Sequence, residues 1–85
     1  MKSWTISWES RAVKELKKLD RQYRIKIVEA VENLSKDPAG GIPLTGQWEG
    51  LWRLRVGSFR VIYGLDHGQL LILIVHVGHR KDVYE

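Results

Sequence analysis

The sequence predicts a single α+β domain in which a helical hairpin packs on one face of a small, mainly antiparallel sheet. Three observations lead to this fold class. Residues 4–8 alternate between apolar and polar side chains, residues 9–34 follow helical periodicity, and residues 51–75 return to strand-like runs separated by turns. The expected order of elements is strand, helix, helix and three strands (β-α-α-β-β-β), in one domain that covers residues 1–85.

The N-terminal half supplies the first strand and the helical hairpin. Residues 4–8 have the strict alternation of a half-buried strand. From Glu9 the apolar side chains follow one helical face to about Leu19, and Asp20 is placed to cap a second helix. The apolar face of that second helix consists of Tyr23, Ile27, Ala30, Val31 and Leu34. We expect both helices to bury their apolar faces against the sheet.

The connection over residues 35–50 contains both prolines and four of the eight glycines, which predicts an irregular segment that wraps an edge of the domain. Two apolar runs then flank the dipeptide Gly57-Ser58, the pattern of a hairpin with a type II′ turn. A two-residue turn places Arg55 opposite Arg60, and Arg53 then lies on the same face of the hairpin.

A second turn and a final strand complete the predicted sheet. Residues 66–69 form the turn, and residues 70–75 are apolar at every position, as is typical of a strand covered on both faces. We expect His76 to lie in register with Phe59 and to be a partly buried structural histidine.

Composition limits the classes of function. The formal net charge of +4 favours a polyanionic or acidic partner. The absence of cysteine excludes disulfides and thiolate chemistry, so the cytoplasm is the expected compartment. The longest apolar run, residues 70–75, is far shorter than the roughly 20 residues that a membrane-spanning helix needs, and we expect no membrane association.

Chemistry that depends on a metal or cofactor is not expected. The three histidines fall on a turn, a strand end and the C-terminal tail, at positions 67, 76 and 79, which is not the spacing of a metal site. No serine stands in a nucleophile motif, and no glycine-rich loop opens a helix to hold a nucleotide phosphate.

The three arginines of the hairpin are the most informative candidates for a binding site. Like charges that face each other across two strands destabilise a sheet, and residues 51–65 contain no acidic side chain. A distant carboxylate or an anionic ligand must supply the counter-charge, and guanidinium groups suit phosphate. The alternative is a solvated face on which arginine stems cover apolar neighbours such as Ile62. Trp48 and Trp52 likewise allow either stacking on bases or burial in the core.

Several motifs resemble the RelE/ParE superfamily of toxin–antitoxin toxins. The resemblance runs nearly end to end and includes the opening helix, residues 11–19. The motifs are Leu44-Thr45-Gly46, residues 50–57, residues 59–63, Val77-Gly78-His79-Arg80 and Val83-Tyr84. The resemblance implies a RelE-like toxin domain and a ribosome-dependent endoribonuclease (mRNA interferase), which cuts mRNA in the ribosomal A site by metal-independent attack of the 2′-OH. It also implies a small RelB-like antitoxin as partner, with operator DNA bound only by the toxin–antitoxin complex.

The resemblance also assigns roles to residues. Arg60 would stabilise the transition state, Arg80 would assist the leaving oxygen, and Tyr84 would stack on or orient a nucleotide. Arg53 and Arg55 would hold backbone phosphates at positions where relatives commonly have lysines. His79 belongs to the substrate-binding set and is an alternative acid or base.

Two other functions remain open within the same superfamily. ParE-type members share the fold but inhibit DNA gyrase, which requires no nuclease site. A toxin-like domain could also act only as an antitoxin-bound co-repressor at DNA. The sequence alone leaves these alternatives beside the ribonuclease.

Overall fold

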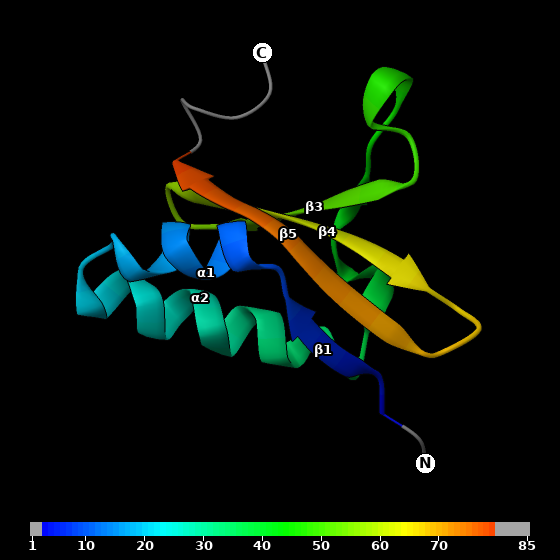
Figure 1. Cartoon of the computed structure of the whole chain (residues 1–85), viewed down its shortest axis with the longest axis horizontal. Helices are drawn as coiled ribbons and strands as arrows, with labels where there is room; N and C mark the ends of the chain where they lie inside the picture. Colours follow the sequence, from blue (N-terminus) through cyan, green and yellow to red (C-terminus); the bar gives the residue numbers. More distant parts are fainter. Residues whose placement is uncertain (1–2, 80–85) are drawn as a thin grey trace.

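The computed structural model describes residues 3–79, in which two helices cover one face of a five-stranded sheet (Figure 1). The predicted α+β class and order of elements are confirmed, with one short additional strand. The elements are β1 (Thr5–Trp8), α1 (Ser10–Lys17), α2 (Arg21–Asn33), β2 (Ile42–Pro43), β3 (Leu51–Val56), β4 (Phe59–Asp66) and β5 (Leu71–His79). No helix in this part of the chain is long and apolar enough to cross a membrane.

The sheet has the strand order β1-β5-β4-β3-β2, in which only the β1–β5 pair is parallel. The pairing between β1 and β5 ends at Trp8 and Ile74, whereas β5 continues to His79. Helix α1 packs beside this extension of β5 (Figure 1). Along the last part of β5, the neighbour on this side is therefore helix α1 and not a strand.

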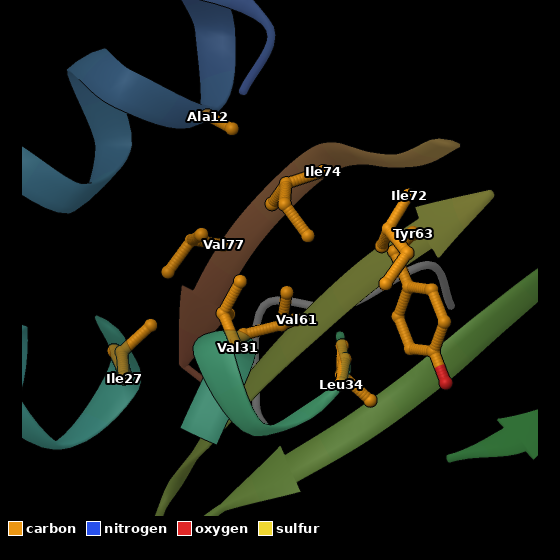
Figure 2. Close-up of a cluster of buried hydrophobic side chains, with 9 residues drawn as sticks. All are labelled: Ala12, Ile27, Val31, Leu34, Val61, Tyr63, Ile72, Ile74 and Val77. Carbon is orange, nitrogen blue, oxygen red and sulfur yellow. The ribbon is translucent and has the colours of Figure 1, made fainter. Parts of the chain in front are cut away.

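The core lies between the helices and the sheet. Its buried side chains come from α1, α2 and the C-cap residue of α2, β4 and β5, and Figure 2 shows them converging. They are Ala12, Ile27, Val31, Leu34, Val61, Tyr63, Ile72, Ile74 and Val77. The predicted apolar face of the second helix is thus confirmed at three positions, but Tyr23 is 38% exposed and lies outside the core, in contact with Phe59.

The connection between α2 and β3 is anchored by the one tyrosine of the core. Tyr63 donates a hydrogen bond from its hydroxyl to Pro38 O at 2.8 Å and accepts one from the Gly41 N–H at 3.0 Å. In Figure 2 this hydroxyl lies at the margin of the apolar cluster. The segment predicted as irregular does lie at the sheet edge, but it also contains β2, which pairs with β3. Two residues are too short for a periodicity signal, so the sequence did not reveal this strand.

Replacing Tyr63 by phenylalanine should destabilise the fold by about 1 to 3 kcal/mol, because two backbone groups lose their partner. Burial raises the pKa of this phenol, the Gly41 N–H lowers it, and the Asp37 carboxylate raises it. Because folding raises the pKa of Tyr63, this phenol ionises at a lower pH in the unfolded chain than in the folded one. The stability that neutral Tyr63 contributes is therefore fully present below about pH 10, and it is lost as pH rises further. Urea unfolding of both proteins at pH 8 and pH 11 measures the difference, which should shrink at the higher pH.

The two hairpins differ in how well the sequence predicted them. Gly57 has φ 60°, as the first central position of a type II′ turn requires, and the predicted pairing of Arg55 with Arg60 is confirmed. In contrast, His76 pairs with Ile62 and not with Phe59, so the predicted register was wrong.

The register differs for two reasons. The turn before β5 occupies residues 67–70, and an irregularity in the β4–β5 pairing adds a residue on β5 between Ile74 and His76. Together these shift the end of β5 by three residues relative to the expected pairing. His79 consequently lies opposite Phe59.

Candidate functional site

The arginines of the hairpin lie on the sheet face that the helices leave uncovered. Successive side chains of a strand point to opposite faces. Leu54, Val56 and Phe59 pack against the core on the helix side. Arg53, Arg55 and Arg60 therefore occupy the opposite face, which we call the open face, as the hairpin register predicts.

The open face is organised in rows across the strands. Arg55 of β3 pairs with Arg60 of β4, which in turn pairs with Gly78 of β5. We call this the arginine row. Gly78 has no side chain, so the arginine row is open on the β5 side. Arg55 is exposed and forms no ion pair within residues 3–79. Two arginines at directly opposed positions on an uncovered sheet face are suited to binding an anion.

The row next to it is more buried. It consists of Arg53, Ile62 and His76 on β3, β4 and β5. Ile62 is only 2% exposed although it does not belong to the core cluster, and the Arg53 Nε atom is buried. The two arginines of β3 therefore differ in their surroundings, and whether an anion binds them stays a prediction. Arg53 is partly buried beside Ile62, whereas Arg55 is exposed to solvent.

His79 lies on the opposite face of the sheet from the three arginines. Its ring makes an edge contact with Phe59, with 5.5 Å between ring centroids and an interplanar angle of 77°. Phe59 in turn contacts Tyr23 of α2 at 5.0 Å, so these rings lie on the helix side of the sheet. They line a groove of about 440 Å³ between α2 and the β3–β4 turn. Arg80 and Tyr84, the other two predicted site residues, lie outside the described residues.

A pair of side chains that the sequence analysis did not connect lies beside the arginine row. His76 is partly buried as expected, with 18% of its side chain exposed, and its partner is Glu15 of α1. The two residues are 61 positions apart, so no spacing in the sequence relates them. The only available signal was a single acidic residue in an otherwise lysine-rich helix. Within residues 3–79, no three His, Asp or Glu side chains gather as a metal site.

A pocket of about 300 Å³ opens on the same face, beside Ile62 and His76 of the neighbouring row and near the N-terminal end of α1. Ile62, Val75 and His76 line it from the sheet, and Trp48 lines it from the turn before β3. Trp52, by contrast, stacks on Tyr63 at 6.2 Å on the core side. The structure thus separates the two tryptophans, and only Trp48 belongs to the open face.

Comparisons with known proteins agree with this architecture. Residues 6–84 match the family model described as the ParE toxin of the type II toxin–antitoxin system. Toxin RelG of Mycobacterium tuberculosis is 31% identical over 83 residues, which cover 95% of each chain. Toxin RelE of the same organism is 32% identical over 81 residues, which cover 93% of this chain and 84% of the relative.

A solved structure shows the same fold. The toxin–antitoxin complex RelBE2 of Mycobacterium tuberculosis contains a chain that superposes with a TM-score of 0.86 at 30% identity, covering 92% of this chain and 99% of the other. The family match spans nearly the whole sequence and includes β3 and β4, which carry the three arginines of the open face. The chain therefore belongs to the RelE/ParE family of toxins of type II toxin–antitoxin systems.

Proposed function

We propose that this toxin is a ribosome-dependent endoribonuclease that cleaves mRNA in the A site by metal-independent attack of a 2′-OH on the adjacent phosphate. The observation that carries the proposal is the arginine row, where Arg55 and Arg60 face each other on an uncovered sheet surface. A phosphate bound between them relieves their repulsion. The relatives named RelE and RelG support the same class of toxin.

In this proposal, catalysis comes from orientation and from fixed positive charge. The attack produces a 2′,3′-cyclic phosphate and a 5′-OH, and the phosphate becomes more negative in the transition state. Arg60 stabilises that charge, while Arg53 and Arg55 hold the RNA backbone. Arg80 and Tyr84 keep their proposed roles at the leaving oxygen and at a nucleotide base.

The decisive experiment maps mRNA ends in a translation extract with and without ribosomes. We expect cleavage within codons at the A site only when ribosomes are present and translating. Cleavage of free RNA at the same positions would contradict the ribosome requirement, and intact mRNA would contradict the nuclease itself.

A ParE-like inhibitor of DNA gyrase is the second candidate, because the family model that matches the chain is that of the ParE toxin. This function needs no reaction at the arginine row. The same extract, supplemented with gyrase and supercoiled plasmid, separates the two functions. DNA breaks without mRNA cleavage would favour gyrase as the target.

A small antitoxin is the proposed partner that holds the toxin inactive. The groove between α2 and the β3–β4 turn offers apolar contact through Tyr23 and Phe59, and Lys26 at its rim suits an acidic side chain. We expect a RelB-like protein to copurify with the toxin from its native host. Replacing Tyr23 by glutamate should weaken that complex at least tenfold by calorimetry, and recovery of the toxin alone from the host would contradict the partner.

A further inference from the structure

The contact between Glu15 and His76 is built to orient an imidazole. The His76 Nδ1 atom lies 3.0 Å from one carboxylate oxygen of Glu15 and 2.8 Å from the other. The first oxygen also accepts the Val77 N–H at 2.9 Å, and the second accepts Arg11 Nε at 3.2 Å. The carboxylate is thus held by a backbone group and by an arginine while it contacts the ring.

This contact determines which nitrogen of the neutral ring carries the proton. A carboxylate can only accept, so Nδ1 is the protonated nitrogen, and Nε2 keeps its lone pair. A carboxylate in the same arrangement orients the histidine of a protease triad and stabilises the imidazolium that forms when the ring takes a proton. The Glu15–His76 pair has the chemistry of a general base with its positioning residue.

The available nitrogen points toward the arginine row. A Cβ atom added at Gly78 would lie 2.9 Å from His76 Nε2, so this nitrogen sits directly over Gly78. Gly78 is the residue that pairs with Arg60. His76 and Arg60 are diagonal neighbours on adjacent strands, a separation of about 7 to 8 Å that long and aromatic side chains can bridge.

The same ring is accessible from the open face. His76 lines the pocket of about 300 Å³, whose walls include Ile62, Val75 and Trp48. The charged residues that line the pocket are Glu9 and Arg11, at the N-terminal end of α1, and Glu15 contacts the ring itself. Arg60 is the diagonal neighbour of His76 on the adjacent strand, whereas Arg53 is separated from His76 by Ile62. The positive charges of Arg11 and Arg60 favour an incoming phosphate.

We infer that His76 is the general base of the cleavage reaction, with Glu15 as its positioning residue, and that the pocket receives the nucleotide whose 2′-OH attacks. The inference depends on the proposed ribonuclease function. In the step, the 2′-OH proton passes to His76 Nε2 as the bond from O2′ to phosphorus forms and the bond from phosphorus to O5′ breaks. The leaving 5′ oxygen takes a proton from water, and the imidazolium returns its proton to solvent.

Other candidates for the base fit less well. The guanidinium groups of Arg53, Arg55 and Arg60 offer only N–H donors and no acceptor for the 2′-OH proton. His79 lies against Phe59 on the helix side, away from the arginine row. Of the histidines in residues 3–79, only His76 lies on the open face, because His67 belongs to the β4–β5 turn and contacts Trp4.

The test measures single-turnover cleavage on programmed ribosomes. The variant His76→Asn keeps an N–H donor for Glu15 but has no basic nitrogen at the Nε2 position. We expect its rate to fall at least tenfold at an unchanged melting temperature. His67→Asn is the matched control and should cleave at the unmodified rate. In His76→Ala, added imidazole should restore part of the lost rate, as it supplies the missing base.

The role of Glu15 is tested by a double substitution. Glu15→Gln still accepts the Val77 N–H but turns an N–H group toward Nδ1, which disfavours the required tautomer. It should slow cleavage in the unmodified toxin and have no further effect in the His76→Asn background. Equal slowing in both backgrounds would show a purely structural role for Glu15.

Three outcomes distinguish the two proposals. If the unmodified toxin cleaves, His76→Asn is slow and imidazole rescues His76→Ala, the inference is supported. If the unmodified toxin cleaves and His76→Asn is equally fast, the inference alone is overturned. If the unmodified toxin leaves mRNA intact on active ribosomes, the proposed function is overturned and the inference with it.

Discussion

Arg60→Ala should lower the single-turnover rate of mRNA cleavage by about 10² to 10³, the usual loss when one oriented group that stabilises developing negative charge is removed. Arg60 is the central member of the arginine row, between Arg55 and Gly78. On the β5 side Gly78 has no side chain that could replace Arg60, so only Arg55 remains in the row. Growth inhibition should accordingly disappear when the variant is produced at the level of the unmodified toxin.

The same substitution should leave the fold intact. It removes one of two like charges that face each other across β3 and β4, so repulsion with Arg55 decreases. Arg21→Ala, on the exposed surface of α2, is a control of identical chemistry and should remain toxic. Equal toxicity of Arg60→Ala and the unmodified protein, at equal abundance, would remove Arg60 from the mechanism.

The position of the arginines could be predicted because it depends on local geometry. A two-residue turn at Gly57-Ser58 defines the pairing of its flanking strands, and strand alternation then assigns every side chain to a face. Arg55 opposite Arg60 follows from these two rules alone, and the structure confirms it. No knowledge of the rest of the fold is required.

The surroundings of the arginine row could not be predicted because they depend on long-range packing. The irregularity after Ile74 changes the register of β5, and the residue types at that point do not indicate an irregular pairing. The contact between Glu15 and His76 exists because α1 lies beside the part of β5 that extends past β1. The general base that we propose therefore emerged only from the structure.

The tryptophans illustrate the same limit. Trp52 and Trp48 lie close together in the sequence, and either could stack on a base or fill the core. Strand alternation at Trp52 places it on the core side, where it stacks on Tyr63. Trp48 precedes β3 in a short 3₁₀ turn, Gly46–Trp48, where no periodic rule applies. Its place on the open face had to be observed.

Ile74→Ala should destabilise the fold by about 2 to 5 kcal/mol, because truncating a fully buried side chain leaves a cavity. Ile74 pairs with Trp8 of β1 and with Tyr63 of β4, so both neighbours in the sheet lose contacts. Ile42→Ala is the matched control. It removes the same atoms from a side chain that is 55% exposed in β2 and should change stability by less than about 0.5 kcal/mol.

Toxicity should fall in Ile74→Ala for a different reason than in Arg60→Ala. A domain of this size is stable by only about 5 to 15 kcal/mol, so the core variant is degraded more readily in the cell. At low temperature, where it is folded, its cleavage rate per molecule should remain within about tenfold of the unmodified toxin, since the arginines keep their strand register. The Arg60 variant should instead be abundant, folded and inactive. Chemical denaturation together with single-turnover rates at 10 °C separates the two, and a folded Ile74→Ala protein without activity would mean that packing beneath β5 positions the catalytic groups on the open face.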